Sequence, residues 1–280
     1  MKHIAKNRSI DKVETTRISG APGQVLCEQV LDAVSVEEPL EIRVGSRGAV
    51  QQVAVTMRTP GTDTELAVGF LFTEGVIKAK GDIAGVELDK RCNGVTVNLV
   101  DQVELDPAVF ARHSFVASSC GICGKRSIDA VRVKRQYECQ KDKPVVSYQL
   151  IHKLPDLLRS QQENFDHTGG IHASCLFDTE GNLLALFEDV GRHNALDKLI
   201  GAQLLADTLP LTDRLLMLSG RASFELIQKA AHAGIALIAA VGAPSSLAVQ
   251  LAAECDITLL GFVRDGRFNI YSGAHRIQYS

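Results

Sequence analysis

The chain has 280 residues, of which 45% are hydrophobic and 22% charged, with 7 Cys and no Trp. A chain of this length buries about three quarters of its unfolded surface, so it needs neither disulfides nor a metal to fold. The composition excludes collagen-like, disordered and disulfide-scaffold proteins, and no apolar run reaches the roughly 18 residues of a membrane span. The basic N-terminus has no apolar stretch behind it. We therefore expect no signal peptide, and free thiols in the cytoplasm.

The formal net charge of −3 gives no overall attraction to nucleic acid. The charge is uneven, because residues 125–143 hold seven Lys or Arg against three acids, while 1–20 and 264–280 are also net positive. Such basic segments on an acidic body suit a phosphate-bearing ligand or an acidic partner. They are equally typical of solvated loops.

The first part of the chain predicts a small α+β unit. Residues 1–20 are polar and aperiodic, which indicates a mobile tail, and the unit occupies residues 21–110. Partly alternating β-branched residues predict strands, and a Gly-Ser-Arg-Gly turn separates the first two. The expected elements are strands at 40–44, 50–56, 86–88 and 94–100, and a helix that begins near Asp63 and stops at Gly75.

Residues 111–143 form a different kind of segment. Serines lead into Cys120-Gly-Ile-Cys123-Gly, and a basic run follows. Small residues and glycines favour a flexible connection, so we place a domain boundary here.

Residues 144–280 alternate between short apolar strands and helices. Continuous apolar strands separated by helices are typical of parallel βαβ units with both sheet faces covered. The sequence therefore predicts an α/β domain with a mostly parallel sheet. Its expected strands are 172–177, 183–187, 215–218, 235–241 and 257–260, and its helices are 150–160, 191–200 (stopped by Gly201), 223–232 and 244–254.

The Cys-x-x-Cys spacing permits several interpretations. A structural zinc site needs four ligands, and only scattered candidates such as Cys92, His113 and Cys139 accompany the pair. A thioredoxin-like dithiol would sit between a strand and a helix, which this sequence does not suggest. A mobile thiol carrier would use the glycines for movement and the nearby Lys125 and Arg126 to favour the thiolate. Two cysteines in a turn without chemistry also fit the spacing.

Seven segments in order give the chain a recognisable pattern. They are Leu66–Gly75, Cys92–Gly94, Cys120–Gly124, Thr168–His172, Glu188–Lys198, Ser219–Ser223 and Gly261–Arg267. In these segments the chain resembles the formate dehydrogenase accessory sulfurtransferase family (FdhD), over roughly residues 35–275. Each motif alone is weak, but seven in the expected order are specific.

The resemblance implies a sulfur carrier that takes sulfur from a cysteine desulfurase as a persulfide. The sulfur then passes to the molybdenum (or tungsten) bis-molybdopterin guanine dinucleotide cofactor before its insertion into apo formate dehydrogenase. The persulfide maps to Cys120, the role of Cys123 stays open, and the resemblance implies no intrinsic metal. The cofactor-holding segment maps to Phe262, Val263, Arg264, Asp265, Gly266 and Arg267.

The resemblance also implies a cytidine-deaminase-like fold for the second domain. A deaminase needs a His-x-Glu element and a later Cys pair around zinc. The segment His172-Ala-Ser174 lacks the Glu, and no Cys pair follows it. We therefore do not expect deamination.

The residue types are consistent with a nucleotide ligand. Arg264 and Arg267 could each fork onto phosphate and the Phe262 ring could stack on a base, although an exposed Arg-Asp-Gly-Arg turn fits the same residues. Arg221 and Ser223 lie where a helix should begin, which suits an anion or simply a helix cap. Glu188, Asp189, Arg192 and His193 form a second cluster, which fits either a catalytic or ligand-orienting network or a structural group of ion pairs, and we favour the structural interpretation slightly, because no nucleophile lies beside them in the sequence. His172 suits a core histidine, and Cys27, Cys175 and Cys255 suit packing thiols.

Two rival functions stay open at this point. One is a non-catalytic chaperone that binds the dinucleotide and the apoenzyme without using either loop cysteine. The other is a zinc-dependent nucleotide hydrolase. A loop that serves two partners is compatible with a homodimer, which the sequence pattern does not demand.

Overall fold

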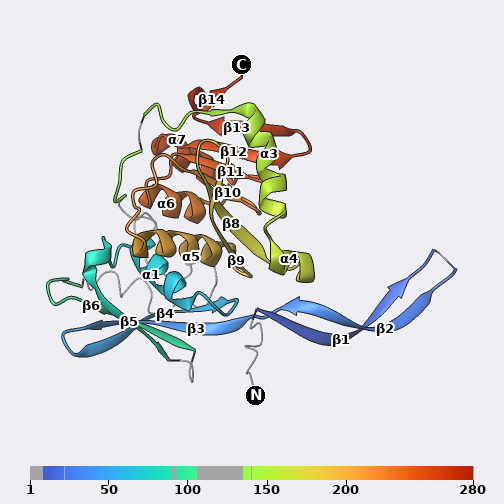
Figure 1. The fold of residues 1–280 in the computed structure, drawn as a ribbon, viewed down its shortest axis with the longest axis horizontal. Helices are drawn as coiled ribbons and strands as arrows, with labels where there is room; N and C mark the ends of the chain where they lie inside the picture. The colour runs from blue at the N-terminus through green and yellow to red at the C-terminus, as the bar shows by residue number, and fades with distance from the viewer. Residues whose placement is uncertain (1–8, 22, 90–92, 106–134, 140, 280) are drawn as a thin grey trace.

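The computed structural model describes residues 9–21, 23–89, 93–105, 135–139 and 141–279. Figure 1 shows a layered body from which a long two-stranded ribbon projects. No helix within these described ranges is long and apolar enough to cross a membrane.

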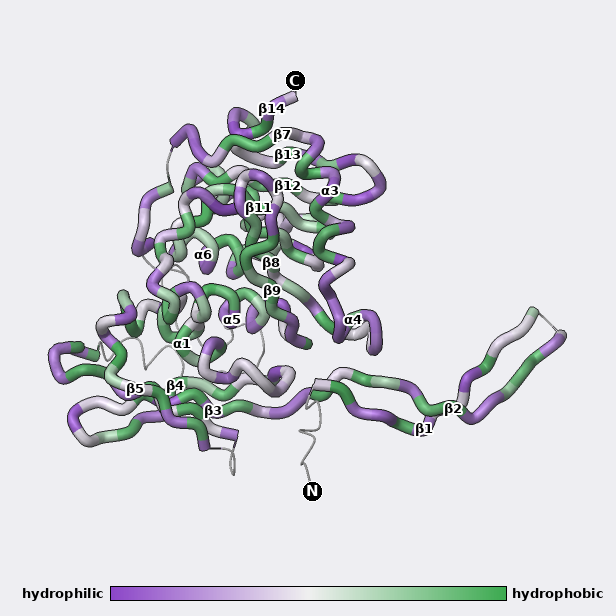
Figure 2. The backbone as a smooth tube through the Cα atoms, viewed as in Figure 1, coloured by the Kyte–Doolittle hydropathy of each residue, from purple (hydrophilic) through white to green (hydrophobic). Residues whose placement is uncertain are grey.

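The projecting ribbon consists of β1 (Ile10–Ser19) and β2 (Leu26–Ser35), paired antiparallel along their whole length. The prediction of a mobile tail is therefore wrong for residues 10–19. The ribbon is joined to the body at its base, where the Ser9 hydroxyl donates to the side chain of Asn164 at 3.0 Å. Figure 2 shows hydrophobic residues along it, and Ile18 and Leu31 are exposed. Within the described part of the chain no second layer covers the ribbon, and its two strands lack the alternation of a half-buried strand.

A four-stranded sheet with the order β4-β3-β6-β5 forms the lower layer in Figure 1. Alternate residues of β3 (Leu40, Ile42 and Val44) are buried, which gives the sheet one core face. Arg47 and Gly48 make the turn between β3 and β4 with positive φ angles of 50° and 79°, as a tight hairpin requires. The elements are β3 (Glu38–Ser46), β4 (Ala49–Arg58), α1 (Asp63–Thr73), η1 (Lys80–Asp82), β5 (Ile83–Asp89) and β6 (Gly94–Leu99).

The second sheet has six strands in the order β13-β12-β11-β10-β8-β9. It confirms an α/β fold, but only β10, β11 and β12 run parallel, and the outer pairings are antiparallel. β8 with β9, and β12 with β13, form hairpins, so each of these two pairs is antiparallel; β8 also runs antiparallel to β10. The strands are β8 (His172–Phe177), β9 (Leu183–Asp189), β10 (Leu215–Leu218), β11 (Leu237–Ala240), β12 (Thr258–Arg264) and β13 (Arg267–Ser272).

Helices cover both faces of this six-stranded sheet. Leu216 and Leu218 of β10 share a core with α5, α6 and α7, whereas Leu215 and Met217 pack with α3 on the other face. A short pair of strands and a 3-10 turn complete the C-terminal end. The bounds are β7 (Val146–Ser147), α3 (Tyr148–Arg159), α4 (Glu163–Thr168), α5 (Arg192–Leu205), α6 (Phe224–His232), α7 (Ser246–Glu254), η3 (Ala274–Arg276) and β14 (Ile277–Gln278).

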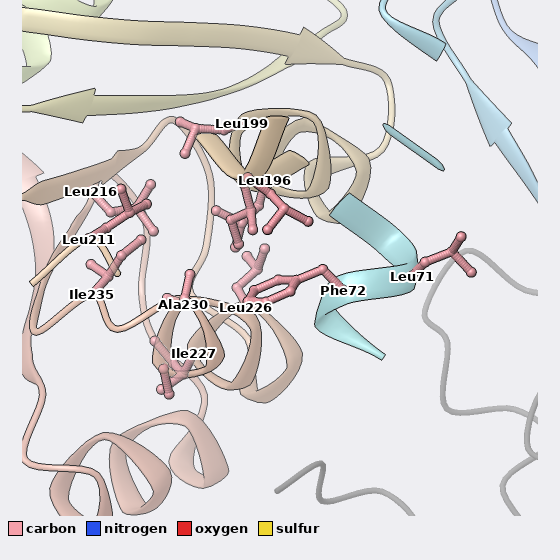
Figure 3. Packing of buried hydrophobic residues seen from close by; sticks show 14 of the residues in the cluster. Leu71, Phe72, Leu196, Leu199, Leu211, Leu216, Leu226, Ile227, Ala230 and Ile235 are labelled. Atoms are coloured by element: carbon pink, nitrogen blue, oxygen red, sulfur yellow. The ribbon is translucent and has the colours of Figure 1, made fainter. Parts of the chain in front are cut away.

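Two glycines allow α1 to lie directly against α5. A Cβ on Gly69 would stand 1.8 Å from the carbonyl oxygen of Asp197, and one on Gly201 would stand 1.9 Å from that of Glu65. The prediction that Gly201 ends the helix is therefore wrong, because α5 continues to Leu205 and the glycine serves this close contact. The two parts of the chain consequently share one core, in which Phe72 meets the leucines of α5 and α6 (Figure 3).

A group of charged side chains is buried where α1, α5 and α6 meet. The Lys229 ammonium donates to both carboxylate oxygens of Asp197 and to the hydroxyl of Thr73, each at 2.9 Å. Lys229 and Asp197 are each only 1% exposed. Burial of an ion pair is favourable only when its remaining hydrogen bonds are satisfied, and the Thr73 hydroxyl provides one of them.

Candidate functional site

The predicted Cys120–Cys123 loop lies outside the described residues, as does Cys92. The structure does describe the predicted cofactor-holding segment, the clusters around Glu188 and Arg221, and four other cysteines. Among these described residues, no group of three or more His, Cys, Asp or Glu is placed to hold a metal ion.

The four described cysteines differ in accessibility. Cys175 and Cys255 are buried, in agreement with a packing role, and burial raises the pKa of the Cys175 thiol. Burial also raises the pKa of Cys139 to about 11. The thiols of Cys139 and Cys175 are therefore protonated at neutral pH and are poor nucleophiles. Cys27 is exposed on β2, so the prediction that it packs is wrong. The apolar neighbours that suggested packing belong to the uncovered ribbon.

The predicted cofactor-holding segment forms the hairpin between β12 and β13. The sequence predicted that the strand ends at residue 260, before this segment. In the structure β12 continues to Arg264, so Phe262, Val263 and Arg264 belong to the strand itself. A register shift between Gly261 and Arg264 accompanies a positive φ of 54° at Phe262, an unusual angle for a bulky residue. Asp265 and Gly266 then make the turn, with φ angles of 53° and 68°.

Side chains in this hairpin differ in what they could contact. Arg264, Asp265, Gly266 and Arg267 are exposed, whereas Val263 is fully buried in the core beside α3. The Arg264 guanidinium lies 6.0 Å from the centre of the Phe262 ring, and its Nε is 3.8 Å from Asp265. An exposed pair of this kind contributes little to stability and is easily replaced by a ligand. The buried side chain of Val263 is not accessible to a ligand.

The loops at the carboxyl end of the parallel strands are joined by backbone hydrogen bonds. Gly242 after β11 donates to the carbonyl of Gly220 after β10 at 3.0 Å, and Phe262 donates to the carbonyl of Gly242 at 3.1 Å. Ligands of α/β proteins bind at this end of the strands. The hairpin and the loops after β10 and β11 therefore share one edge of the sheet.

Most of the Glu188–His193 cluster is structural, as the sequence indicated. Asp189 is fully buried and accepts from Lys198 Nζ at 2.7 Å and from the backbone nitrogens of Thr59 and Gly191. Glu188 accepts from two backbone nitrogens at the start of α4. These carboxylates hold the two sheets and α4 together.

His193 and Ser223 contact one another across two helix starts. His193 Nε2 lies 3.1 Å from Ser223 Oγ and 3.5 Å from Glu225 Oε2. Ser223 stands at the N-cap position of α6, as expected, but its side chain makes no capping hydrogen bond. Ser223 and Glu225 thus approach the same ring nitrogen, whereas in a Ser-His-acid triad the serine and the acid contact different nitrogens.

A sequence profile decides the family of this chain. The profile of the FdhD/NarQ family matches residues 35–278. The chain belongs to the FdhD/NarQ family. This match spans both sheets and includes the Cys120–Cys123 loop and the β12–β13 hairpin.

Curated FdhD relatives are similar over almost their whole length. A Streptomyces avermitilis protein is 44% identical over 99% of this chain and 97% of its own length. One from Mycolicibacterium paratuberculosis is 47% identical, over 88% of this chain and 92% of its own. One from the archaeon Picrophilus torridus is 41% identical, over 89% and 93%. Each is named sulfur carrier protein FdhD.

A solved structure shares the fold of this FdhD/NarQ chain. It is described as a formate dehydrogenase accessory protein from Desulfotalea psychrophila, and it covers 95% of this chain and 99% of its own with a TM-score of 0.72. At 21% sequence identity, this likeness concerns the fold alone.

The loop after β11, which contains Gly242, was not predicted from the sequence to belong to this edge of the sheet. A Cβ on Gly242 would stand 2.9 Å from Arg221 Cγ, so the glycine allows the arginine to lie against the loop. The sequence does contain a signal for this loop. Gly-Ala-Pro-Ser directly follows one apolar strand, just as Ser-Gly-Arg-Ala-Ser directly follows the apolar strand before it. Equivalent loops after neighbouring parallel strands meet at one edge.

His172 provides a test of the charge at this edge. Burial, Arg192 and Arg221 hold its pKa below the ordinary value of 6.5, while Asp189 opposes them. We expect Arg221→Gln to raise the pKa of the His172 ring, because it removes a positive charge, as followed by NMR titration of the ring protons. An unchanged pKa would show that Arg221 does not act on the ring.

The same shift makes stability depend on pH. Because its pKa is lowered in the folded protein, His172 takes up a proton less readily there than in the unfolded chain. Its contribution to stability is therefore present above the unfolded pKa of 6.5 and is lost as the pH falls through the folded pKa. In Arg221→Gln this loss should be smaller.

Proposed function

We propose that this chain is a sulfur carrier in the maturation of formate dehydrogenase. The observation that supports it is the 41–47% identity, over most of the chain, to relatives named sulfur carrier protein FdhD. The chain also contains the Cys-Gly-Ile-Cys-Gly loop that a mobile thiol carrier needs.

In the first step of this proposal, Cys120 receives sulfur from a cysteine desulfurase. The Cys120 thiolate attacks the outer sulfur of the desulfurase persulfide, a new S–S bond forms, and the desulfurase thiolate leaves with the electron pair of the broken bond. This is thiol exchange with no net oxidation, so no further general acid or base is required. Lys125 and Arg126 would favour the attacking thiolate.

In the second step, the S–S bond of the Cys120 persulfide breaks and its outer sulfur passes to the molybdenum bis-molybdopterin guanine dinucleotide, which is the substrate rather than a resident cofactor. The Cys120 thiolate leaves, and the two electrons that convert the transferred sulfur to sulfide would come from the metal of this substrate in its reduced form. The β12–β13 hairpin would hold the dinucleotide, with the exposed Arg264 and Arg267 directed to phosphate and Phe262 to the base. Val263 contributes through its backbone, since its side chain is buried. Apo formate dehydrogenase is the recipient of the sulfurated cofactor, and the reactions take place in the cytoplasm.

The proposal is tested by following the sulfur itself. The chain is loaded by a cysteine desulfurase with radioactive cysteine, purified again, and mixed with formate dehydrogenase that carries unsulfurated cofactor. We expect the label to move to the cofactor and activity to rise with it. If unloaded chain activates the enzyme equally well, the chain is a non-catalytic chaperone and the proposal is wrong.

A further inference from the structure

Two cysteines that the proposed function leaves unused lie close together beside the six-stranded sheet. Cys255 follows α7 directly and is 5% exposed, within the core that α5, α6 and α7 cover. Cys139 is half-buried and packs against that same core. Both are present as thiols in this structure. They belong to segments far apart in the sequence, so it is the fold that brings them together.

The segment 135–139 crosses the amino ends of β11 and β12. The Arg135 guanidinium donates to the backbone carbonyl of Cys255 at 3.4 Å. Cys139 Sγ lies 3.8 Å from the backbone carbonyl of Ile235, to which it donates. Ile235 comes shortly before β11 and Cys255 shortly before β12, and these two strands are parallel neighbours. The two contacts therefore place Cys139 at the strand start next to that of Cys255.

The charged groups that act on the Cys139 thiol belong to the same place. Burial is the largest effect and raises the pKa of this thiol to about 11. The positive charges of Arg135 and Arg276 oppose the rise, whereas negative charge on Cys255 or Asp256 adds to it. Asp256 follows Cys255 in the chain and pairs with Arg276 at 3.0 Å. Cys139 is thus surrounded by the turn that contains Cys255 and by the partners of that turn.

We propose that Cys139 and Cys255 are a redox site, and that hydrogen peroxide converts the two thiols to a reversible disulfide. Cys139 reacts first, because its side chain is partly accessible whereas that of Cys255 is enclosed. The inference does not rest on the proposed function, since neither Cys120 nor Cys123 takes part in it.

The reaction has two steps. The Cys139 thiolate attacks one oxygen of the peroxide, the O–O bond breaks, and the other oxygen leaves as hydroxide, so that Cys139 becomes a sulfenic acid. The Cys255 thiolate then attacks this sulfur, an S–S bond forms, and the sulfenic oxygen leaves as hydroxide. The two thiol protons convert both hydroxides to water. Two electrons pass from the thiols to the peroxide, and a dithiol reductant reverses the change by thiol exchange.

The environment of Cys139 sets the rate of this reaction. Only a small share of Cys139 is thiolate at neutral pH, because its pKa is about 11. The thiolate is the attacking form, so the disulfide should form slowly at neutral pH and about tenfold faster for each pH unit added below that pKa. The pair therefore responds to sustained rather than brief exposure to peroxide.

Mass spectrometry of the oxidised chain tests this site. The full chain is treated with hydrogen peroxide at neutral and at mildly alkaline pH, its remaining thiols are blocked, and it is digested without reductant. No cysteine desulfurase is present, so the result is separate from sulfur transfer. We expect a pair of fragments joined through Cys139 and Cys255, two hydrogens lighter than the separate fragments, formed faster at the higher pH and separated again by dithiothreitol.

Three variants are treated in the same way. Cys139→Ser and Cys255→Ser should each abolish the joined fragments. The matched control is Cys175→Ser, because Cys175 is also buried but belongs to the core on the other face of the sheet, and it should leave the joined fragments unchanged. Melting curves check that the variants fold, and the half-buried position of Cys139 makes its replacement the milder one.

The proposal is overturned if oxidised wild type contains no fragments joined through Cys139 and Cys255. A Cys139 that accumulates only as sulfinic acid would show that Cys255 does not reach it. A Cys139 joined to some other cysteine would show that the pair has been assigned wrongly.

Discussion

Cells that carry Cys120→Ala as their only copy of this chain are expected to contain inactive formate dehydrogenase. The variant lacks the thiolate to which the proposed function assigns sulfur acceptance. Formate oxidation in cell extracts should fall to the level of cells that lack the chain. The amount of formate dehydrogenase protein, measured in parallel, shows whether maturation rather than synthesis has failed.

Cys27→Ala is the matched control for this experiment. Cys27 is exposed on the projecting ribbon, opposite Ile18, so its thiol is accessible but belongs to no predicted site. We expect this variant to support full activity. If activity is lost with Cys27→Ala and kept with Cys120→Ala, Cys120 is not the carrier and the proposed assignment is wrong. Cys123→Ala, assayed beside them, separates the roles of the two loop thiols.

Lys229→Met is expected to destabilise the protein by about 3–5 kcal/mol, because it leaves the Asp197 carboxylate buried without its cation. Although burial acts to lower the pKa of Lys229, Asp197, Glu74 and Glu225 raise it, so the lysine is charged in the folded protein. Its removal leaves a group of acids with no compensating charge. The free energy of unfolding is measured by urea denaturation.

The pH dependence and two further variants test the cause of this loss. A buried carboxylate without a partner takes up a proton more readily, so the destabilisation should shrink as the pH is lowered. Adding Asp197→Asn to Lys229→Met should restore part of the stability, because no isolated charge remains. Lys153→Met, at an exposed position of α3, should change stability little. A loss that is equal at all pH values would indicate a packing defect instead.

Elements with a clear local signal could be predicted from the sequence. The bounds of β8 and β10 agree with their apolar runs, because each strand is buried between helices and needs apolar residues on both faces. The buried contacts of Asp189 agree with the structural interpretation that its sequence context slightly favoured over a ligand-orienting one. Local pattern could not show that the sheet is antiparallel on both sides, since strand direction depends on which strands become neighbours.

Long-range contacts explain the predictions that were wrong. Gly201 resembles a helix stop in the sequence, and only the approach of α1 shows why a glycine stands inside α5. The β1–β2 ribbon lacks the alternation that reveals a half-buried strand, because it projects from the body.

The central claim is that Cys120 carries the sulfur, and a mass measurement tests it most directly. The chain is incubated with a cysteine desulfurase and cysteine, digested without reductant, and the fragment spanning Cys120 and Cys123 is sequenced by mass spectrometry. We expect a gain of one sulfur atom on Cys120, absent in Cys120→Ala and retained in Cys27→Ala. If the chain gains no sulfur, or gains it equally in Cys120→Ala, Cys120 is not the carrier.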